Sequence, residues 1–140
     1  MFNIKEKIIQ KTFEFTSNLH KISNQEFKEL NIGEGQHVVL KKIYENRGIS
    51  INEVANKLNR DKTTISKTIK KLIAKKLVYS NADKSDGRVI RLYINDRKIE
   101  SVELIQKKFK KIDSKVFKGI KTSEQKIFLE ILNKIISNIK

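Results

Sequence analysis

The stretch from residue 50 to residue 76 reads SINEVANKLNRDKTTISKTIKKLIAKK, and its pattern decides how the rest of the chain is interpreted. Ser50 and Glu53 stand at the spacing of a capping box, in which the first side chain bonds an amide of the first turn and the second reaches back. A short helix is therefore expected to start after Ser50. Asp61 is a second capping residue, and it predicts a longer helix that runs to Lys76. Two helices separated by a short break are typical of a helix-turn-helix.

Apolar and cationic residues occupy opposite sides of the second helix of this pair. At about 100° per residue, the side predicted to be buried contains Ile65, Ile69, Leu72 and Ile73. The opposite side contains Thr63, Lys67, Lys70, Lys71 and Ala74. No acidic residue occurs between Lys62 and Ala82, although a solvated helix usually mixes both signs to gain i,i+4 pairs of about 0.2–0.5 kcal/mol each. The one-sided charge favours an anionic partner over a merely solvated helix.

After this helix the sequence pattern predicts β-strands. Residues 78–80 and 89–94 contain β-branched and aromatic side chains, and in the second segment Ile90, Leu92 and Ile94 alternate with other residues. Residues 82–87 combine Asp, Ser and Gly, which is turn chemistry. The sequence therefore predicts a two-stranded hairpin with a basic tip. The cations of this tip are Lys84 and Arg88.

Helical periodicity also precedes and follows this region. Apolar residues recur at three- and four-residue steps in segments 4–22, 36–45, 99–116 and 127–139. The expected order is long helix, helix, short helix, helix, hairpin, long helix and helix. We therefore expect a mostly α fold with a small β-hairpin, that is, a winged helix-turn-helix with further helices at both ends. Caps for the last two helices are expected at Asn95 and Thr122.

The composition narrows the possible functions. The 140 residues carry 31 Lys+Arg against 16 Asp+Glu, a formal charge of +15, which favours nucleic acid as a partner, although base-composition bias in a genome can also enrich lysine. The chain has no Cys, so disulfides, thiolate metal sites, iron–sulfur clusters and thiol-based peroxide sensing are excluded. It has neither a signal-peptide core nor an apolar run long enough to span a membrane. A cytoplasmic protein without membrane association is expected.

These patterns together predict a surface for double-stranded DNA. A helix fits the major groove, and the side chains near its start that can reach base edges are Thr63, Thr64, Ser66 and Lys67. The predicted phosphate anchors are Lys70, Lys71 and Lys75. The predicted wing residues are Lys84, Asp86 and Arg88. Arg88 could enter a minor groove, with Asp86 orienting it or capping the turn, whereas the alternative is a plain surface ion pair.

The same residues resemble the MarR family of bacterial transcription regulators over nearly the whole chain. The most specific part runs from INEVA at 51–55 through TTISKTIKKL at 63–72 to Asp86-Gly87-Arg88, which stands at the Asp-x-Arg motif of the family's wing. The sequence departs from the family at Lys76, where a Gly is usual. It departs again after the wing, where Ile94-Asn95 replaces Leu-Thr and no Gly follows.

The resemblance implies a homodimer with a palindromic DNA site. Residues 1–32 and 96–140 would form the helical dimerisation region, and residues 33–95 the DNA-binding domain. Periodicity supports this independently, because the apolar stripe of a 99–116 helix about 30 Å long needs a partner, and segments 2–22 and 127–139 are available. Two-fold symmetry predicts half-sites about 10–10.5 base pairs apart, or a multiple. A repressor role with release by a small-molecule effector is implied by the resemblance alone.

Other classes of function remain as alternatives. The same charge could serve a nonspecific architectural or single-strand binder, although the basic surface lacks aromatic stacking platforms apart from Tyr79 and Tyr93. A winged-helix module that binds protein is a third class. A metal-responsive regulator would need His20 and His37 to meet near Glu34 or Glu26. No nucleophile or metal motif indicates an enzyme, and no cofactor is expected.

Overall fold

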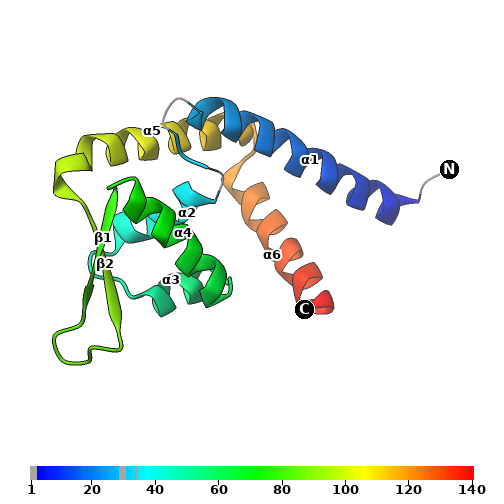
Figure 1. The fold of residues 1–140 in the computed structure, drawn as a ribbon. Coiled ribbons are helices and arrows are strands. Elements are labelled where there is room, and N and C mark those ends of the chain that lie inside the picture. The colour runs from blue at the N-terminus through cyan, green and yellow to red at the C-terminus, as the bar shows by residue number, and fades with distance from the viewer. Residues whose placement is uncertain (1–2, 29–30, 34) are drawn as a thin grey trace. The chain divides into compact units, whose positions relative to one another are not determined.

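A computed structural model describes residues 3–28, 31–33 and 35–140 of the chain (Figure 1). It divides into two compact units, Met1–Phe109 and Lys110–Lys140. The helices and strands are α1 (Ile4–Phe27), α2 (Gln36–Glu45), α3 (Ile51–Leu58), α4 (Lys62–Ala74), β1 (Val78–Ala82), β2 (Ile90–Ile94), the 3-10 turn η1 (Asp96–Lys98), α5 (Ile99–Val116) and α6 (Thr122–Ile139). This order confirms the predicted succession of helices and hairpin, and the fold is a winged helix-turn-helix.

The core of the first unit lies where α2, α3, α4 and the hairpin meet. Its most deeply buried aliphatic side chains include Leu40, Ile43, Val54, Ile65 and Leu72. Full burial of one such side chain stabilises the fold by about 1.5–3 kcal/mol. The core therefore fixes how α4 is rotated about its own axis.

One residue predicted for the buried side of α4 does not lie there. Ile73 is 36% exposed, whereas Ile65, Ile69 and Leu72 are buried. At about 100° per residue, Ile69 and Leu72 lie close to Ile65 around the helix, and Ile73 lies furthest from it, at the edge of the apolar arc. The buried arc is thus narrower than the sequence suggested.

The predicted caps of α3 and α4 are present with one change. Ser50 Oγ accepts from the amide of Glu53 at 3.1 Å, but the Glu53 carboxylate lies 3.6 Å from Arg91 instead of completing the capping box. Asp61 accepts from both the amide and the hydroxyl of Thr64, at 2.9 and 2.8 Å. These bonds lower the pKa of the Asp61 carboxyl, led by the amide bond. Asp61 thus stays ionised at the positive end of α4.

Helix α4 ends two residues earlier than predicted, at Ala74. Lys76 adopts a left-handed conformation with φ of 63°. Its amide donates to the Ile73 carbonyl at 2.9 Å, and the Leu77 amide donates to the Leu72 carbonyl at 3.1 Å. This pair of bonds is the Schellman motif, which usually places glycine at the left-handed position. The chain therefore enters the wing through a lysine whose backbone conformation is strained.

The wing is an antiparallel pair in the register Val78↔Ile94, Ser80↔Leu92 and Ala82↔Ile90. The first strand is two residues longer than predicted, and Val89 belongs to the turn because its amide bonds the Asp86 carbonyl at 3.0 Å. The Leu92 amide donates to the Ile49 carbonyl at 2.9 Å, which ties the hairpin to the segment before α3. The hairpin extends beyond the helices of this unit, with the turn at its far end (Figure 1).

Aromatic packing joins α1, α2 and the first part of α5 within the first unit. The His37 ring is stacked on Phe27, with centroids 4.8 Å apart, and lies 5.1 Å from the Phe109 ring. The Lys108 Nζ atom lies 3.7 Å from Glu26 Oε2. Asn95, predicted to cap the long helix that follows, caps η1 instead: its side chain accepts from the Arg97 amide at 3.2 Å, and η1 leads directly into α5.

Helices α1 and α6 carry the predicted apolar stripes on exposed surface. Phe13 on α1 is 73% exposed in the single chain, and Ile135 on α6 is 43% exposed. The segment 2–22 proposed as a packing partner begins at Phe2, which lies outside the described residues. The cap of α6 is one residue earlier than predicted, since the amide of Lys121 donates to Glu124 at 2.9 Å and Thr122 is already helical.

The left-handed backbone conformation of Lys76 leads to a prediction about stability. Replacement Lys76→Gly relieves the steric cost of a side chain at positive φ, and we expect the free energy of unfolding to rise by about 1 kcal/mol. Urea unfolding measures this change. The control Lys70→Gly, in the exposed middle of α4, is expected to lower it by about 1 kcal/mol. A loss of stability in both variants contradicts the prediction.

Candidate nucleic-acid interface

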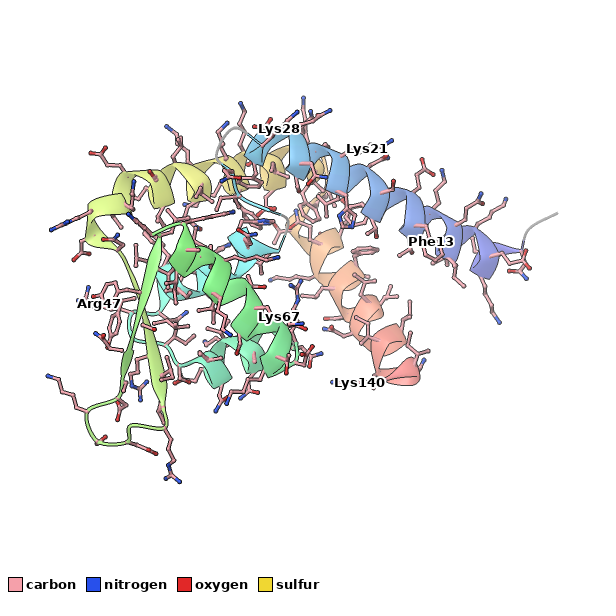
Figure 2. The ribbon with its side chains drawn as sticks, viewed as in Figure 1. Phe13, Lys21, Lys28, Arg47, Lys67 and Lys140 are labelled. Carbon is pink, nitrogen blue, oxygen red and sulfur yellow. The ribbon has the colours of Figure 1, made fainter. Side chains whose placement is uncertain are left out.

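The outward side of α4 is cationic along its length. Thr63, Lys67, Lys70 and Lys71 are exposed, and Ser66 is half-buried. Lys67 is labelled on α4 in Figure 2. Thr64 is also exposed, but its hydroxyl already donates to Asp61. Its methyl group and the lone pairs of its hydroxyl oxygen remain for contacts with a ligand. The structure thus brings together the predicted residues of the recognition helix.

Lys75 is a correction to the predicted set of phosphate anchors. Its ammonium donates to the Asn31 carbonyl and, at 2.6 Å, to Gln36 Oε1. Burial, with a smaller effect of Lys71, lowers the pKa of Lys75. The side chain therefore ties the end of α4 to the connection between α1 and α2. Helical spacing alone could not reveal this, because both acceptors come from a distant part of the sequence.

The wing tip is organised around the carboxylate of Asp83. Its Oδ2 accepts from the amide of Ser85 at 3.1 Å, from the Ser85 hydroxyl at 2.6 Å and from the Asp86 amide at 3.1 Å. Its Oδ1 accepts from Arg91 Nε at 2.7 Å. These bonds, the one from Arg91 above all, hold the pKa of Asp83 far below its usual range. Asp83 was not among the predicted wing residues, although its place at the start of the turn marks it as a turn-forming side chain.

Asp86 both shapes the turn and orients Arg88, the two roles that the sequence left open. Asp86 Oδ1 accepts from the Arg88 amide at 3.0 Å and from Arg88 Nε at 3.1 Å. The Arg88 side chain is nevertheless 92% exposed. An exposed ion pair stabilises the fold by less than about 1 kcal/mol. Its main effect here is to hold an extended guanidinium in one direction. Lys84 is also exposed at this tip.

A small hollow lies between the helix-turn-helix and the wing. It is lined by Ser50, Ile51, Asn52, Lys62, Arg88, Val89 and Ile90. The hollow brings Arg88 together with the first residue of α4 and with the first turn of α3, two places where the positive end of a helix dipole favours anions. Lys62 and Asn52 were missed as candidate contacts. Their positions at the starts of helices were the available signal.

The comparisons agree on one family. A sequence profile of the MarR family matches residues 32–90. YybA of Bacillus subtilis (strain 168), an uncharacterized HTH-type transcriptional regulator, is 27% identical over 122 residues, covering 87% of this chain and 81% of YybA. A MarR protein from Peptoclostridium difficile DA00132 superposes with a TM-score of 0.81 at 29% identity, over 99% of this chain and 91% of that one. The MepR–DNA complex of S. aureus gives a TM-score of 0.80 at 21% identity, over 99% of both chains.

Residues 32–90 form a MarR-family domain. With this domain the chain is a DNA-binding transcription regulator and not an enzyme, because the MarR proteins and YybA to which it is similar are transcription regulators. The predicted family, the fold class and the general function are thereby confirmed. The roles of the individual residues of this regulator remain predictions.

The histidines do not come together as a metal site in the part of the regulator that the structure describes. His20 is exposed on α1, whereas His37 is buried between Phe27 and Phe109. Among the described residues no group of three His, Cys, Asp or Glu side chains could hold a metal ion. Glu34, one of the two acids considered for such a site, lies outside these residues. The metal-responsive alternative thus gains no support.

None of the helices in residues 3–28, 31–33 and 35–140 has the length and apolar character needed to cross a membrane.

The role of Lys75 predicts a change in stability. Replacement Lys75→Met removes two hydrogen bonds from an ammonium, and we expect the free energy of unfolding to fall by about 1–2 kcal/mol. The control Lys71→Met removes an exposed lysine from the same helix and is expected to change stability by less than about 0.5 kcal/mol. Denaturant unfolding distinguishes the two variants. Equal losses would exclude a tethering role for Lys75.

Proposed function

We propose that the protein is a sequence-specific, dimeric repressor that places α4 in the major groove and the wing in the adjacent minor groove. Thr63, Ser66 and Lys67 would contact base edges, whereas Lys70 and Lys71 would neutralise phosphates. Thr64 would offer its methyl group. Arg88 would enter the minor groove with Asp86 holding it, and Lys84 would contact the backbone nearby.

One observation carries this proposal: the exposed side of α4 and the exposed tip of the wing both present cations whose nearby carboxylates are already bonded. Asp61, Asp83 and Asp86 each accept hydrogen bonds within the chain. No other acidic residue occurs from 61 to 88. Phosphates approaching this surface would therefore meet an excess of lysines over carboxylates and one directed arginine.

Selection of duplexes from a random pool, at a stated salt concentration, tests the proposal as a whole. We expect a palindrome with half-sites about 10–10.5 base pairs apart, or a multiple. Equal retention of unrelated duplexes would instead support a nonspecific architectural protein. Negligible affinity for duplexes, even at low salt, would support a module that binds protein.

Single substitutions then separate base contacts from phosphate contacts. We expect Lys67→Ala to weaken binding to the selected duplex by about tenfold and to relax preference at one position, and Lys71→Ala to reduce the slope of log affinity against log salt by about one. Fluorescence anisotropy across a salt series measures both effects. The control Lys107→Ala removes the same charge from α5 and should alter neither. Unchanged affinity in the two α4 variants would contradict the assignment of this surface to DNA binding.

Dimerisation would bury the apolar stripes of the long helices. The exposed stripe of α1 includes Ile8 and Phe13, and that of α6 includes Ile131, Ile135 and Ile136. Contiguous apolar surface of this kind marks an interaction site on a water-soluble protein. In this proposal residues 1–32 and 96–140 form the dimerisation region and residues 33–95 the DNA-binding domain. Two-fold symmetry would present the two α4 helices to the half-sites of a palindrome.

A charge placed in the α6 stripe tests the dimer. Ile135→Glu should shift the protein to monomers, because a carboxylate buried in an apolar interface costs several kcal/mol, and affinity for the palindrome should fall with it. Sedimentation velocity measures the oligomeric state. The control Asn133→Glu introduces the same charge on the same helix, at a position outside the stripe, and should remain dimeric. A wild-type protein that is monomeric at micromolar concentration would contradict this part of the proposal.

The repressor role and its release by a small molecule rest on the MarR-family domain. An effector would act by favouring a dimer whose α4 helices are wrongly spaced for the operator.

The regulator would lie in the cytoplasm, where the DNA that it binds is located. Transcription in vitro from a promoter containing the selected palindrome is expected to fall when the protein is added. A rise would show an activator.

A further inference from the structure

Arg91 on β2 differs from the other cations near the wing because its donors are turned into the protein. Its Nε donates to Asp83 Oδ1 at 2.7 Å, and one terminal nitrogen donates to the Gly48 carbonyl at 3.0 Å. The same nitrogen lies 3.6 Å from a Glu53 oxygen. The Arg91 side chain is 35% exposed. It is thus placed to hold parts of the protein together rather than to contact a phosphate.

The groups that Arg91 joins belong to different parts of the unit. Gly48 lies in the connection between α2 and α3, Glu53 lies in the first turn of α3, and Asp83 begins the turn of the wing. Gly48 also donates its own amide to the Leu92 carbonyl at 3.0 Å, so the middle of β2 is fixed beside it. Arg91 therefore links the far end of the hairpin to the helix-turn-helix through one planar group.

A continuous set of bonds leads from Arg91 to the exposed arginine of the tip. Asp83 uses one oxygen for Arg91 and the other for the amide of Asp86. Asp86 in turn holds the amide and the Nε of Arg88. The first carboxylate stays ionised over a wide range of acid conditions, because its pKa is held far below the usual value. The direction of Arg88 thus depends on a network that begins outside the turn.

A two-stranded ribbon has little stability of its own, and its tip can bend relative to the helices to which it is attached. For a protein that reads a major and a minor groove at once, such bending would alter the distance between the two contacts. We propose that Arg91 is a positioning residue that fixes Arg88 relative to α4 and thereby sets the preference for the base pairs beside each half-site. This inference rests on the proposed function, because it assigns Arg91 a role in that recognition.

A direct phosphate contact is the competing role for Arg91, and the two roles predict different results for Arg91→Lys. A lysine retains the charge, so a phosphate contact would be largely preserved. It lacks the planar fork that bonds Asp83 and Gly48 together, so positioning would be lost. The salt dependence of binding reports the first role, and the coupling between Arg91 and Arg88 reports the second.

The experiment is a double-mutant cycle of Arg91→Lys and Arg88→Ala, measured on the selected duplex and on a duplex whose flanking A·T pairs are changed to G·C. We expect Arg88→Ala to weaken binding by about tenfold in the wild-type background and by less than about twofold in the Arg91→Lys background. The flanking preference should disappear in both single variants. The salt slope of Arg91→Lys should equal that of the wild type.

The full effect of Arg88→Ala in the Arg91→Lys background overturns the inference. It is also overturned if Arg91→Ala lowers the salt slope by about one while Arg91→Lys keeps the flanking preference. The matched control Arg97→Lys, an exposed arginine of η1, should leave the cycle unchanged. If Arg91→Lys does not fold, as judged by circular dichroism, Asp83→Asn replaces it in the cycle, because an amide has one acceptor oxygen where the carboxylate has two and cannot bond Arg91 and the turn amides together.

A measurement without DNA keeps this inference distinct from the proposed function. Hydrogen exchange should be faster at the amides of Ser85 and Asp86 in Arg91→Lys than in the wild type, because Asp83 loses the bond that holds it in place. Unchanged exchange removes the physical basis of the inference, whatever the DNA results. If exchange rises but no duplex is selected by the wild-type protein, the proposed function fails and the DNA-related part of the inference fails with it.

Discussion

The burial of Ile65, Ile69 and Leu72 against α2 and α3 is the constraint on which the remaining structure depends. A lysine ammonium is too costly to bury without a partner, so a helix with these residues on one side and lysines on the other has only one stable rotation. That rotation exposes Lys67, Lys70 and Lys71 together. The apolar core thus decides the electrostatic character of the surface, although none of its members is charged.

The position of the wing depends on a second constraint, which is the satisfaction of backbone polar groups. The middle of β2 bonds the segment before α3 through the amides of Gly48 and Leu92, so residues 48–50 lie along the hairpin like a short third strand. Lys76 takes a left-handed conformation so that the chain can turn from α4 into β1 while the last carbonyls of the helix remain bonded. The strained backbone of Lys76 thus allows the carbonyls of Leu72 and Ile73 to keep their hydrogen bonds.

Periodicity and capping chemistry in the sequence predicted the element order, the caps at Ser50 and Asp61, and the exposed residues of α4. These features are local, and the sequence carries them within a few residues. The bonds from Lys75 to Asn31, in the α1–α2 connection, and from Arg91 to Gly48 join residues 44 and 43 positions apart, so no local pattern encodes them. The ends of α4 and of the strands shifted by one or two residues, because the Schellman motif and the turn bonds of Val89 outweigh intrinsic propensity there. Ile73 shows the limit of a helical wheel, since the width of the buried arc is set by neighbours that the wheel does not contain.

The cations of α4 are all lysines, whereas the exposed tip of the wing presents an arginine held by a carboxylate. A lysine is a flexible point charge that stays attracted to a polyanion in many orientations, and a guanidinium fork is selective in direction. In the proposed complex Lys70 and Lys71 would therefore keep the protein close to any stretch of duplex while it diffuses along the polymer, without locking it in register. Residence would lengthen only where the shape of the neighbouring groove accepts the fork. The phosphate-contacting lysines would thus serve the search for a target, and the arginine would slow departure once a suitable groove is reached.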